Sequence, residues 1–431
     1  NVSTGTELHK LVASDAAAYD NFGISVAISG NYAIVGAHSN DDGGSNSGSA
    51  YIFNVSTGTQ LQKLLASDAS ADDHFGYSVA ISGNYAIVGA YSNDDGGTDS
   101  GSAYIFAPSF HVTESGNVGI GTTFAEEKLV VDGNMRLLGD LNVGLVDADA
   151  THAGTLSAGY DFGSQTKILA SDAAASDQFG ISVAISGNYA IVGAPYNDDG
   201  STNSGSAYIF NVSTGTELHK LVASDANQND YFGYSVAISG NYAIVGAPYN
   251  NDGGTDSGSA YIFNVSTGTE LHKLVAIDDA AYDHFGSNVA ISGNYAIVGA
   301  RYNDDGSTDS GSAYIFNVST GTQLHKLVAS DAAATDYFGY SVAISGNYAI
   351  VGAYGNDDGG TDSGSAYIFN VSTGTELHKL VASDAAANDQ FGTSVAISGN
   401  YAIVVASGDD DVPPNSGSAY IFNVSTGTQL H

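Results

Sequence analysis

Short runs in which apolar residues take every second position recur along the whole chain. Phe22–Ser29 is the first complete run, and this period of two predicts a β-strand with one face in a core. The pair Gly30-Asn31 follows it, which is typical of a two-residue hairpin turn. The next apolar run, Tyr32–Gly36, is therefore predicted to be the antiparallel partner of the first strand.

Two further strands complete the predicted unit. A loop rich in Asp, Gly and Ser leads to Ser49–Phe53, the predicted third strand, and Thr59–Leu65 is the predicted fourth. An equivalent of the fourth strand also stands at the start of the sequence, at Thr6–Val12. No segment has a convincing helical period, so the fold class is all-β.

The unit is repeated seven times. A Phe-Gly pair opens each copy, and successive pairs lie 53 residues apart, except for a gap of 104 that corresponds to 53 plus an insertion of 51. The pairs begin at Phe22, Phe75, Phe179, Phe232, Phe285, Phe338 and Phe391. Four antiparallel strands per unit and seven units predict a seven-bladed β-propeller of four-stranded blades.

The repeats divide the chain into three parts. Residues 1–106 are predicted to form blades 1 and 2, with the N-terminal outer strand closing the ring, and residues 158–431 to form blades 3 to 7. Residues 107–157 are a small β-rich insertion between the third and fourth strands of the second blade. The chain holds eight copies of the outer strand, because Thr428–His431 begins another, whereas a ring of seven blades needs only seven.

The repeat resembles the FG-GAP repeat of integrin α-subunit propellers. Its motif, Phe-Gly followed about ten residues later by Val-Gly-Ala-Pro, stands complete at Val192–Pro195 and Val245–Pro248. Other copies replace the Pro, as at His38 and Arg301, and the last replaces the Gly with Val405. The resemblance implies the propeller fold. Family members often carry a calcium loop between their first two strands, but here that loop is only Ser-Gly-Asn, so that site is not expected.

The insertion is similar to stalk segments of phage tail fibres. The similarity rests on Ser115–Thr123, Lys128–Asn134 and Gly139–Val143. It implies an extracellular, cell-surface or virion-surface setting and self-association. The alternative is a tolerated β-rich excursion from a blade edge.

Charge narrows the range of partners. The chain has 46 acidic residues against 10 Lys and Arg, a formal charge of −36, which excludes nucleic acid as a partner because phosphate binding needs a basic surface. The sequence contains no run of 18 apolar residues, so no transmembrane segment is predicted. In the propeller topology, the entry loop before each Phe-Gly and the loop between strands two and three share one face, and these two loop classes hold 34 of the 46 acids.

The second loop has the spacing of a cation site. Oxygen-bearing side chains alternate in it, as hard cations such as Ca²⁺ require, and Gly permits the turn. The candidate ligands are Asn303, Asp305, Ser307 and Asp309, with Asn250, Asp252, Asp256, Asn356, Asp358 and Asp362 in two other blades. The alternative is a solvated, Asx-rich turn without an ion.

Other recurring polar residues have ordinary structural interpretations beside functional ones. The Asp two residues before each Phe-Gly, such as Asp177 and Asp230, is interpreted as a turn carboxylate that accepts backbone N–H groups. The histidines of the outer strand, such as His9 and His219, are weak candidates for metal ligands on a strand where charge discourages edge pairing. The Asn-Val-Ser-Thr loop is either a polar turn or an N-glycosylation site, at Asn1, Asn54, Asn211, Asn264, Asn317, Asn370 and Asn423.

Variation among the copies gathers on the acidic side. It is found just before Phe-Gly and just after Gly-Ala, at Asn21, His74, Gln178, Tyr231, His38, Tyr91, Pro195 and Arg301. Variation confined to one side of the propeller is typical of a recognition surface. The alternative is that turn chemistry constrains the residues of the other side and leaves this side free to vary.

The sequence predicts a protein that is not an enzyme, since no nucleophile elbow, zinc motif or phosphate loop occurs. The leading hypothesis is an extracellular binding or adhesion module, dependent on cations if Ca²⁺ binds, whose repeated acidic face recognises a glycan or a protein through many weak contacts. The alternative is a structural subunit of a surface fibre, sheath or filament, assembled through the insertion and the terminal strands. An enzyme that borrows the scaffold, such as a hydrolase, ranks third.

Overall fold

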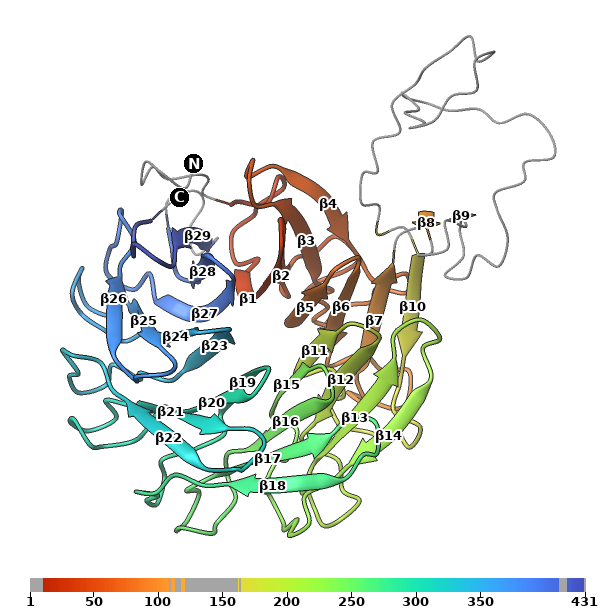
Figure 1. Ribbon diagram of the computed structural model, residues 1–431. Coiled ribbons are helices and arrows are strands. Elements are labelled where there is room, and N and C mark those ends of the chain that lie inside the picture. The colour runs from red at the N-terminus through yellow and green to blue at the C-terminus, as the bar shows by residue number, and fades with distance from the viewer. Residues whose placement is uncertain are drawn as a thin grey trace, which may run out of the picture. The chain divides into compact units, whose positions relative to one another are not determined.

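A computed structural model describes residues 11–107, 110–112, 118–120, 162, 164–410 and 417–429, and within these residues all regular structure is β. The chain divides into two compact units, one made of residues 1–105 and 166–431 and the other of residues 106–165. The first unit is a ring of seven blades around an axis (Figure 1). The predicted seven-bladed propeller is therefore confirmed.

Six of the blades are sheets of four antiparallel strands. Within a blade the first strand lies nearest the axis and the fourth at the rim (Figure 1). The strands of the first three blades are β1 (Phe22–Ser29), β2 (Tyr32–Ala37), β3 (Ser49–Asn54) and β4 (Gln60–Leu64); β5 (Ser78–Ser82), β6 (Tyr85–Ala90), β7 (Ser102–Ala107) and β10 (Ser164–Ile168); and β11 (Val183–Ser186), β12 (Tyr189–Ala194), β13 (Ser206–Asn211) and β14 (Glu217–Leu221).

The remaining blades repeat the pattern. They consist of β15 (Ser235–Ser239), β16 (Tyr242–Ala247), β17 (Ser259–Asn264) and β18 (Glu270–Leu274); β19 (Asn288–Ser292), β20 (Tyr295–Ala300), β21 (Ser312–Asn317) and β22 (Gln323–Leu327); β23 (Ser341–Ser345), β24 (Tyr348–Ala353), β25 (Ser365–Asn370) and β26 (Glu376–Leu380); and β27 (Phe391–Ser398), β28 (Tyr401–Ala406) and β29 (Ser418–Asn423).

The core lies between neighbouring blades, whose sheets pack face to face. In β16, Ala243, Ile244, Val245 and Ala247 are all fully buried, because a blade covers each face of this strand. At the interface of blades 3 and 4, Phe232 packs edge-on against Tyr261 and Phe263, with ring centroids 5.5 and 5.8 Å away. The same cluster recurs between the other blades, which explains why every copy keeps the Phe.

Glycines allow the blades to approach each other. Gly246 lies on β16 where a Cβ atom would come within 2.0 Å of the carbonyl oxygen of Gly286, in the Phe-Gly pair of the next blade. Between blades 7 and 1 the equivalent position is Val405, which is fully buried and packs against Gly23. The closing interface of the ring therefore holds a side chain where the other interfaces have none.

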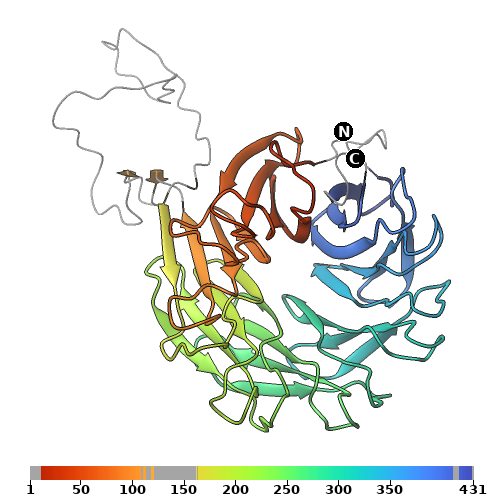
Figure 2. The ribbon, with the colours of Figure 1, turned by 180° about the vertical axis from the view of Figure 1, so that it is seen from behind.

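The seventh blade completes its sheet with pieces from both terminal segments. β29 forms an isolated antiparallel bridge from Ala419 to Leu11 and another from Phe422 to Gln429. Leu11 is fully buried in the cluster that joins blades 7 and 1. Figure 2 shows the ring from behind. Both copies of the outer strand thus contact the same strand.

The second unit holds the insertion. Its described part contains the strand pair β8 (Phe110–Val112) and β9 (Val118–Ile120). The segments that resemble a tail-fibre stalk lie outside the described residues, apart from the part of Ser115–Thr123 that forms β9. Asn1 and His9 lie outside them as well.

Candidate functional site on the acidic face

The two acid-rich loops meet across each blade boundary. The entry loop of blade 5 is hydrogen-bonded to the second loop of blade 4 by backbone contacts of 2.8 Å from Tyr282 N–H to the Thr255 carbonyl and 3.2 Å from His284 N–H to the Asp256 carbonyl. Equivalent contacts join the other neighbouring blades. The two loop classes therefore share one face, as the topology predicts, and we call it the acidic face.

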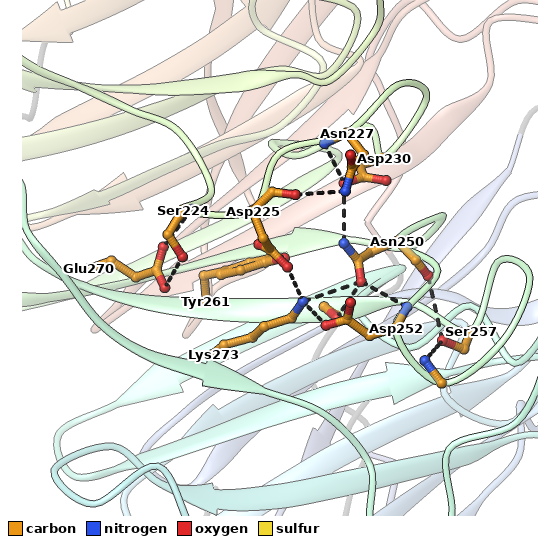
Figure 3. Close-up of polar contacts among 12 residues, drawn as sticks. Ser224, Asp225, Asn227, Asp230, Asn250, Asp252, Ser257, Tyr261, Glu270 and Lys273 are labelled. Carbon is orange, nitrogen blue, oxygen red and sulfur yellow. Dashed lines mark hydrogen bonds and ion pairs between the residues drawn. The ribbon is translucent and has the colours of Figure 1, made fainter. Parts of the chain in front are cut away.

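A lysine ammonium lies at the centre of the polar network of each of blades 1 to 6. In blade 4, Lys273 of β18 donates from Nζ to one carboxylate oxygen each of Asp225, in the entry loop, and Asp252, in the second loop (Figure 3). A third contact, 3.3 Å long, reaches Oδ1 of Asn250, and the ammonium lies 5.3 Å from the ring centre of Tyr261. We call this arrangement the lysine cage.

The cage is repeated around the ring. The lysines and their two carboxylates are Lys63 with Asp15 and Asp42, Lys167 with Asp68 and Asp95, Lys220 with Asp172 and Asp199, Lys326 with Asp278 and Asp305, and Lys379 with Asp331 and Asp358. From the sequence, charge on this outer strand was expected only to discourage edge pairing. Their regular spacing was visible, but not their reach into the loops.

The electrostatics follow from this geometry. Burial on its own would raise the pKa of Asp225, but hydrogen bonds from Lys273 and from the hydroxyl of Tyr261 outweigh it and hold that pKa below its usual value. Burial would lower the pKa of Lys273, and the two carboxylates raise it instead. The cage is therefore a charged network whose cation is supplied by the chain.

The predicted calcium ligands belong to this cage or to turns. In blade 5, Oδ1 of Asn303 and a carboxylate oxygen of Asp305 both accept from Lys326. The backbone N–H of Ser307 is bonded to Ser310 Oγ, and that of Asp309 to Asp304 Oδ1 at 2.7 Å. Among the described residues no group of three or more His, Cys, Asp or Glu side chains is placed to hold a metal ion. With the ammonium between them, these oxygens do not fit Ca²⁺.

The other two candidate sets are arranged alike. In blade 4, Asn250 and Asp252 contact Lys273, while the N–H of Asp256 is bonded to Asn251. In blade 6, Asn356 and Asp358 contact Lys379, and the N–H of Asp362 is bonded to Asp357. Only the first two members of each predicted set are thus brought together.

The second Asp of the entry loop serves as a turn carboxylate. Oδ2 of Asp230 accepts from the backbone N–H of Asn227 at 2.9 Å and from Nδ2 of Asn250 at 3.1 Å. Asp177 makes the same contacts with Ala174 and Asn197. Burial raises the pKa of Asp230. The structural interpretation of this residue is confirmed.

The sequons and outer-strand histidines lie on the opposite face and rim. Oδ1 of Asn264 accepts from the backbone N–H groups of Ser266 and Thr267, which makes the loop an Asx turn. Nε2 of His219 lies 3.2 Å from the carbonyl oxygen of Ser266 in the next blade, which gives it a packing role. Glycosylation of the described sequons stays a prediction.

A belt of half-buried aromatic rings, which sequence reasoning did not predict, lies on the acidic face. Tyr231 contacts Tyr196 and Tyr249 with centroids 5.0 Å apart, and Tyr249 contacts His284 at 4.6 Å. We define the aromatic belt as His38, His74, Tyr77, Tyr91, Tyr196, Tyr231, Tyr249, His284, Tyr302, Tyr337, Tyr340 and Tyr354.

The belt could have been found from the variable positions. Its members occupy the residue before Phe-Gly, the residue after Phe-Gly, or one of the two residues after Gly-Ala. Variation at His38, His74, Tyr91 and Tyr231 was recognised, but not that these side chains come into contact around the axis. In the structure His74 stacks on Tyr91, with an interplanar angle of 5°.

A propeller whose blades each carry the Phe-Gly and Val-Gly-Ala elements defines a class of repeat protein. The model of the FG-GAP repeat matches seven segments of the chain, residues 6–53, 59–106, 162–210, 216–263, 269–316, 322–369 and 375–422. These segments cover more than half of the sequence, so the chain belongs to the FG-GAP repeat family.

Two further comparisons complete the picture. No curated protein matches the chain. Among solved structures, it is similar to the crystal structure of the computationally designed Ika8 protein, with 16% identity, a TM-score of 0.49, and coverage of 99% of this chain and 89% of that one. No helix in the described ranges is long and apolar enough to cross a bilayer.

Proposed function

We propose that this protein is a non-enzymatic, extracellular recognition module that binds a carbohydrate through the aromatic belt. The belt is the observation that carries the proposal, because tyrosines combine a flat apolar ring with a polar tip and are enriched at binding surfaces. The C–H face of a sugar packs against such rings, and its hydroxyls donate to nearby carboxylates.

The state of the carboxylates favours a sugar over a basic protein surface. The six lysine cages pair twelve of the 34 acids in these loops, so about a third of the carboxylates already have a cationic partner. Half-buried acids such as Asp256 and Asp309 remain beside the belt as hydrogen-bond acceptors. Repetition around the ring supports weak contacts that add up through multivalency.

Glycan binding, measured on an array and then by calorimetry, tests the proposal. The double variant Tyr231→Ala/Tyr249→Ala removes adjoining rings of the belt and should weaken binding at least about tenfold, or about 1.4 kcal/mol. The matched control is Tyr242→Ala, a half-buried tyrosine at the Ser-Gly-Asn turn of the opposite face. Equal binding by the double variant and the control would refute the proposal.

The structural alternative has one observation in its favour. Leu11 and Gln429 pair with the same strand, β29, so a copy of the outer strand from a second molecule could take one of the two places. Assembly of this kind would give a sedimentation coefficient that rises with protein concentration. A monodisperse monomer that binds a glycan would instead favour recognition.

A further inference from the structure

A cavity of about 210 Å³ lies between the first strands of the blades, at the axis. Its lining includes Tyr77, Tyr234 and Tyr340, each directly after a Phe-Gly pair, and Ser287 and Thr393 at the same position of blades 5 and 7. Arg301, from the end of β20, also lines it. The cavity differs from the rest of the acidic face because its charged residue is a cation.

Arg301 has no counterion among the residues that the structure describes. Its guanidinium lies 4.9 Å from the ring centre of Tyr302 and 5.4 Å from that of Tyr340, and Nε is buried without a hydrogen-bond partner. Within the described part of the chain it forms no ion pair, although the formal net charge is −36. A half-buried cation without an acidic partner is costly, so the position of Arg301 beside a cavity favours an anion-binding site.

Unused hydroxyl groups line the same cavity. Oγ of Ser287 and Oγ1 of Thr393 are buried and have no hydrogen-bond partner. Two serines of the lining, Ser182 and Ser235, accept backbone N–H groups of the next blade, from Val236 and Val289, at 3.0 Å each. Since these oxygens act as acceptors, their own O–H groups remain free to donate.

We propose that the axial cavity binds a small oxyanion, a carboxylate or a phosphate, through Arg301 and the surrounding hydroxyls. The planar guanidinium matches either group in a bidentate way. The volume equals that of about seven liquid water molecules, which suits a ligand of monosaccharide size or smaller. The proposal goes beyond carbohydrate binding by the belt, because it depends on Arg301 and holds whether or not the belt binds sugar.

Calorimetric titration with inorganic phosphate, glucuronate and neutral glucose, at constant chloride, tests the site. Phosphate or glucuronate should bind with a Kd of about 1 mM or tighter, and which of the two binds identifies the source of the anion. Arg301→Met should weaken that binding at least about tenfold. Glucose, which lacks the charge, should show no dependence on Arg301.

Two further variants test whether misfolding, rather than loss of the site, explains a loss of anion binding. Ser287→Tyr fills the cavity and keeps Arg301, and tyrosine is already present at this position in three other blades. Arg301→Tyr places there the residue that blades 2 and 6 carry, at Tyr91 and Tyr354. Both should fold and lose the anion, while Tyr231→Ala/Tyr249→Ala should keep it. Failure of both anions to bind, or unchanged binding by Arg301→Met, would overturn the site without affecting the belt.

Discussion

Among individual residues, the lysine of the outer strand changes the interpretation of the acidic face. The sequence spacing of Asn250 and Asp252 predicts cation ligands, and the structure does gather their oxygens around a cation. That cation is Lys273, which stands 21 residues after Asp252. Spacing within one loop could not reveal it, because the ammonium arrives from another strand. Metal binding by these residues stays a prediction.

Lys273→Met should lower the free energy of unfolding by about 1–3 kcal/mol. This loss of stability lies between that expected for removing an exposed ion pair and that for breaking a buried one. The reason is that the variant leaves Asp225 and Asp252 close together without a cation. The vacated cage offers two carboxylates and the amide oxygen of Asn250 to a hard cation. Added Ca²⁺ should therefore raise the melting temperature of Lys273→Met more than that of the wild type.

The neighbouring variant His272→Ala is the matched control, since it lies on the same strand and leaves the cage intact. Thermal melts with Ca²⁺ and with chelator make the comparison. If Ca²⁺ raises the melting temperature of the wild-type protein as much as it raises that of Lys273→Met, the lysine is not the resident cation of the loop.

Asp279 is a second residue whose effect can be measured. It stands where the other blades carry alanine, and burial, with Asp283 and Asp252 nearby, raises its pKa to about 6. The folded protein then binds this proton more tightly than the unfolded chain does, so stability falls as the pH rises from about 4 to about 6. Asp279→Ala should remove this loss.

The size of the Asp279 effect is limited by partial exposure. Two pKa units correspond to about 2.7 kcal/mol for a fully buried group, and we expect about 1 kcal/mol for this half-buried carboxyl. Urea unfolding of Asp279→Ala and wild type should show equal stability at pH 4 and a more stable variant at pH 7. An equal difference at both pH values would mean that the charge of Asp279 is not responsible.

At the scale of elements, the strands were predicted almost to the residue. The predicted first strand of blade 1 coincides with β1, and the second and third each end one residue later than predicted, at Ala37 and Asn54. Repetition made this possible, because seven copies show which positions a strand requires. The error lies at the Phe-Gly pair: in blade 2 the strand begins only at Ser78, since Phe75 pairs with Gly48 of the preceding blade.

The Val-Gly-Ala element shows the same limit. Within one blade Gly246 looks like an ordinary strand residue, and the reason for it is a backbone atom of the next blade. Val405 is tolerated because it faces the closing interface, where it packs against Gly23. The aromatic belt and the axial cavity likewise depend on contacts between neighbouring blades, which the pattern within a single blade does not show.

For the whole molecule, closure of the ring is the feature that the repeats alone leave open. Eight copies of the outer strand compete for seven places, and Leu11 and Gln429 both reach β29. Their burial differs: the side chain of Leu11 is fully buried in the cluster that joins blades 7 and 1, whereas that of Gln429 is half-buried and hydrogen-bonded to Ser383. Apolar burial should therefore make the N-terminal segment the one that stabilises the ring.

Leu11→Ala tests this directly. It should lower the free energy of unfolding by about 2–5 kcal/mol, like Leu274→Ala at the equivalent, 1% exposed position of blade 4. Gln429→Ala removes two exposed hydrogen bonds to Ser383 and should lower it by about 1 kcal/mol or less. Urea unfolding of the three variants gives the answer. If Leu11→Ala is as mild as Gln429→Ala while Leu274→Ala is severe, the N-terminal segment does not hold the ring closed, and the place beside β29 is open to an outer strand from another molecule.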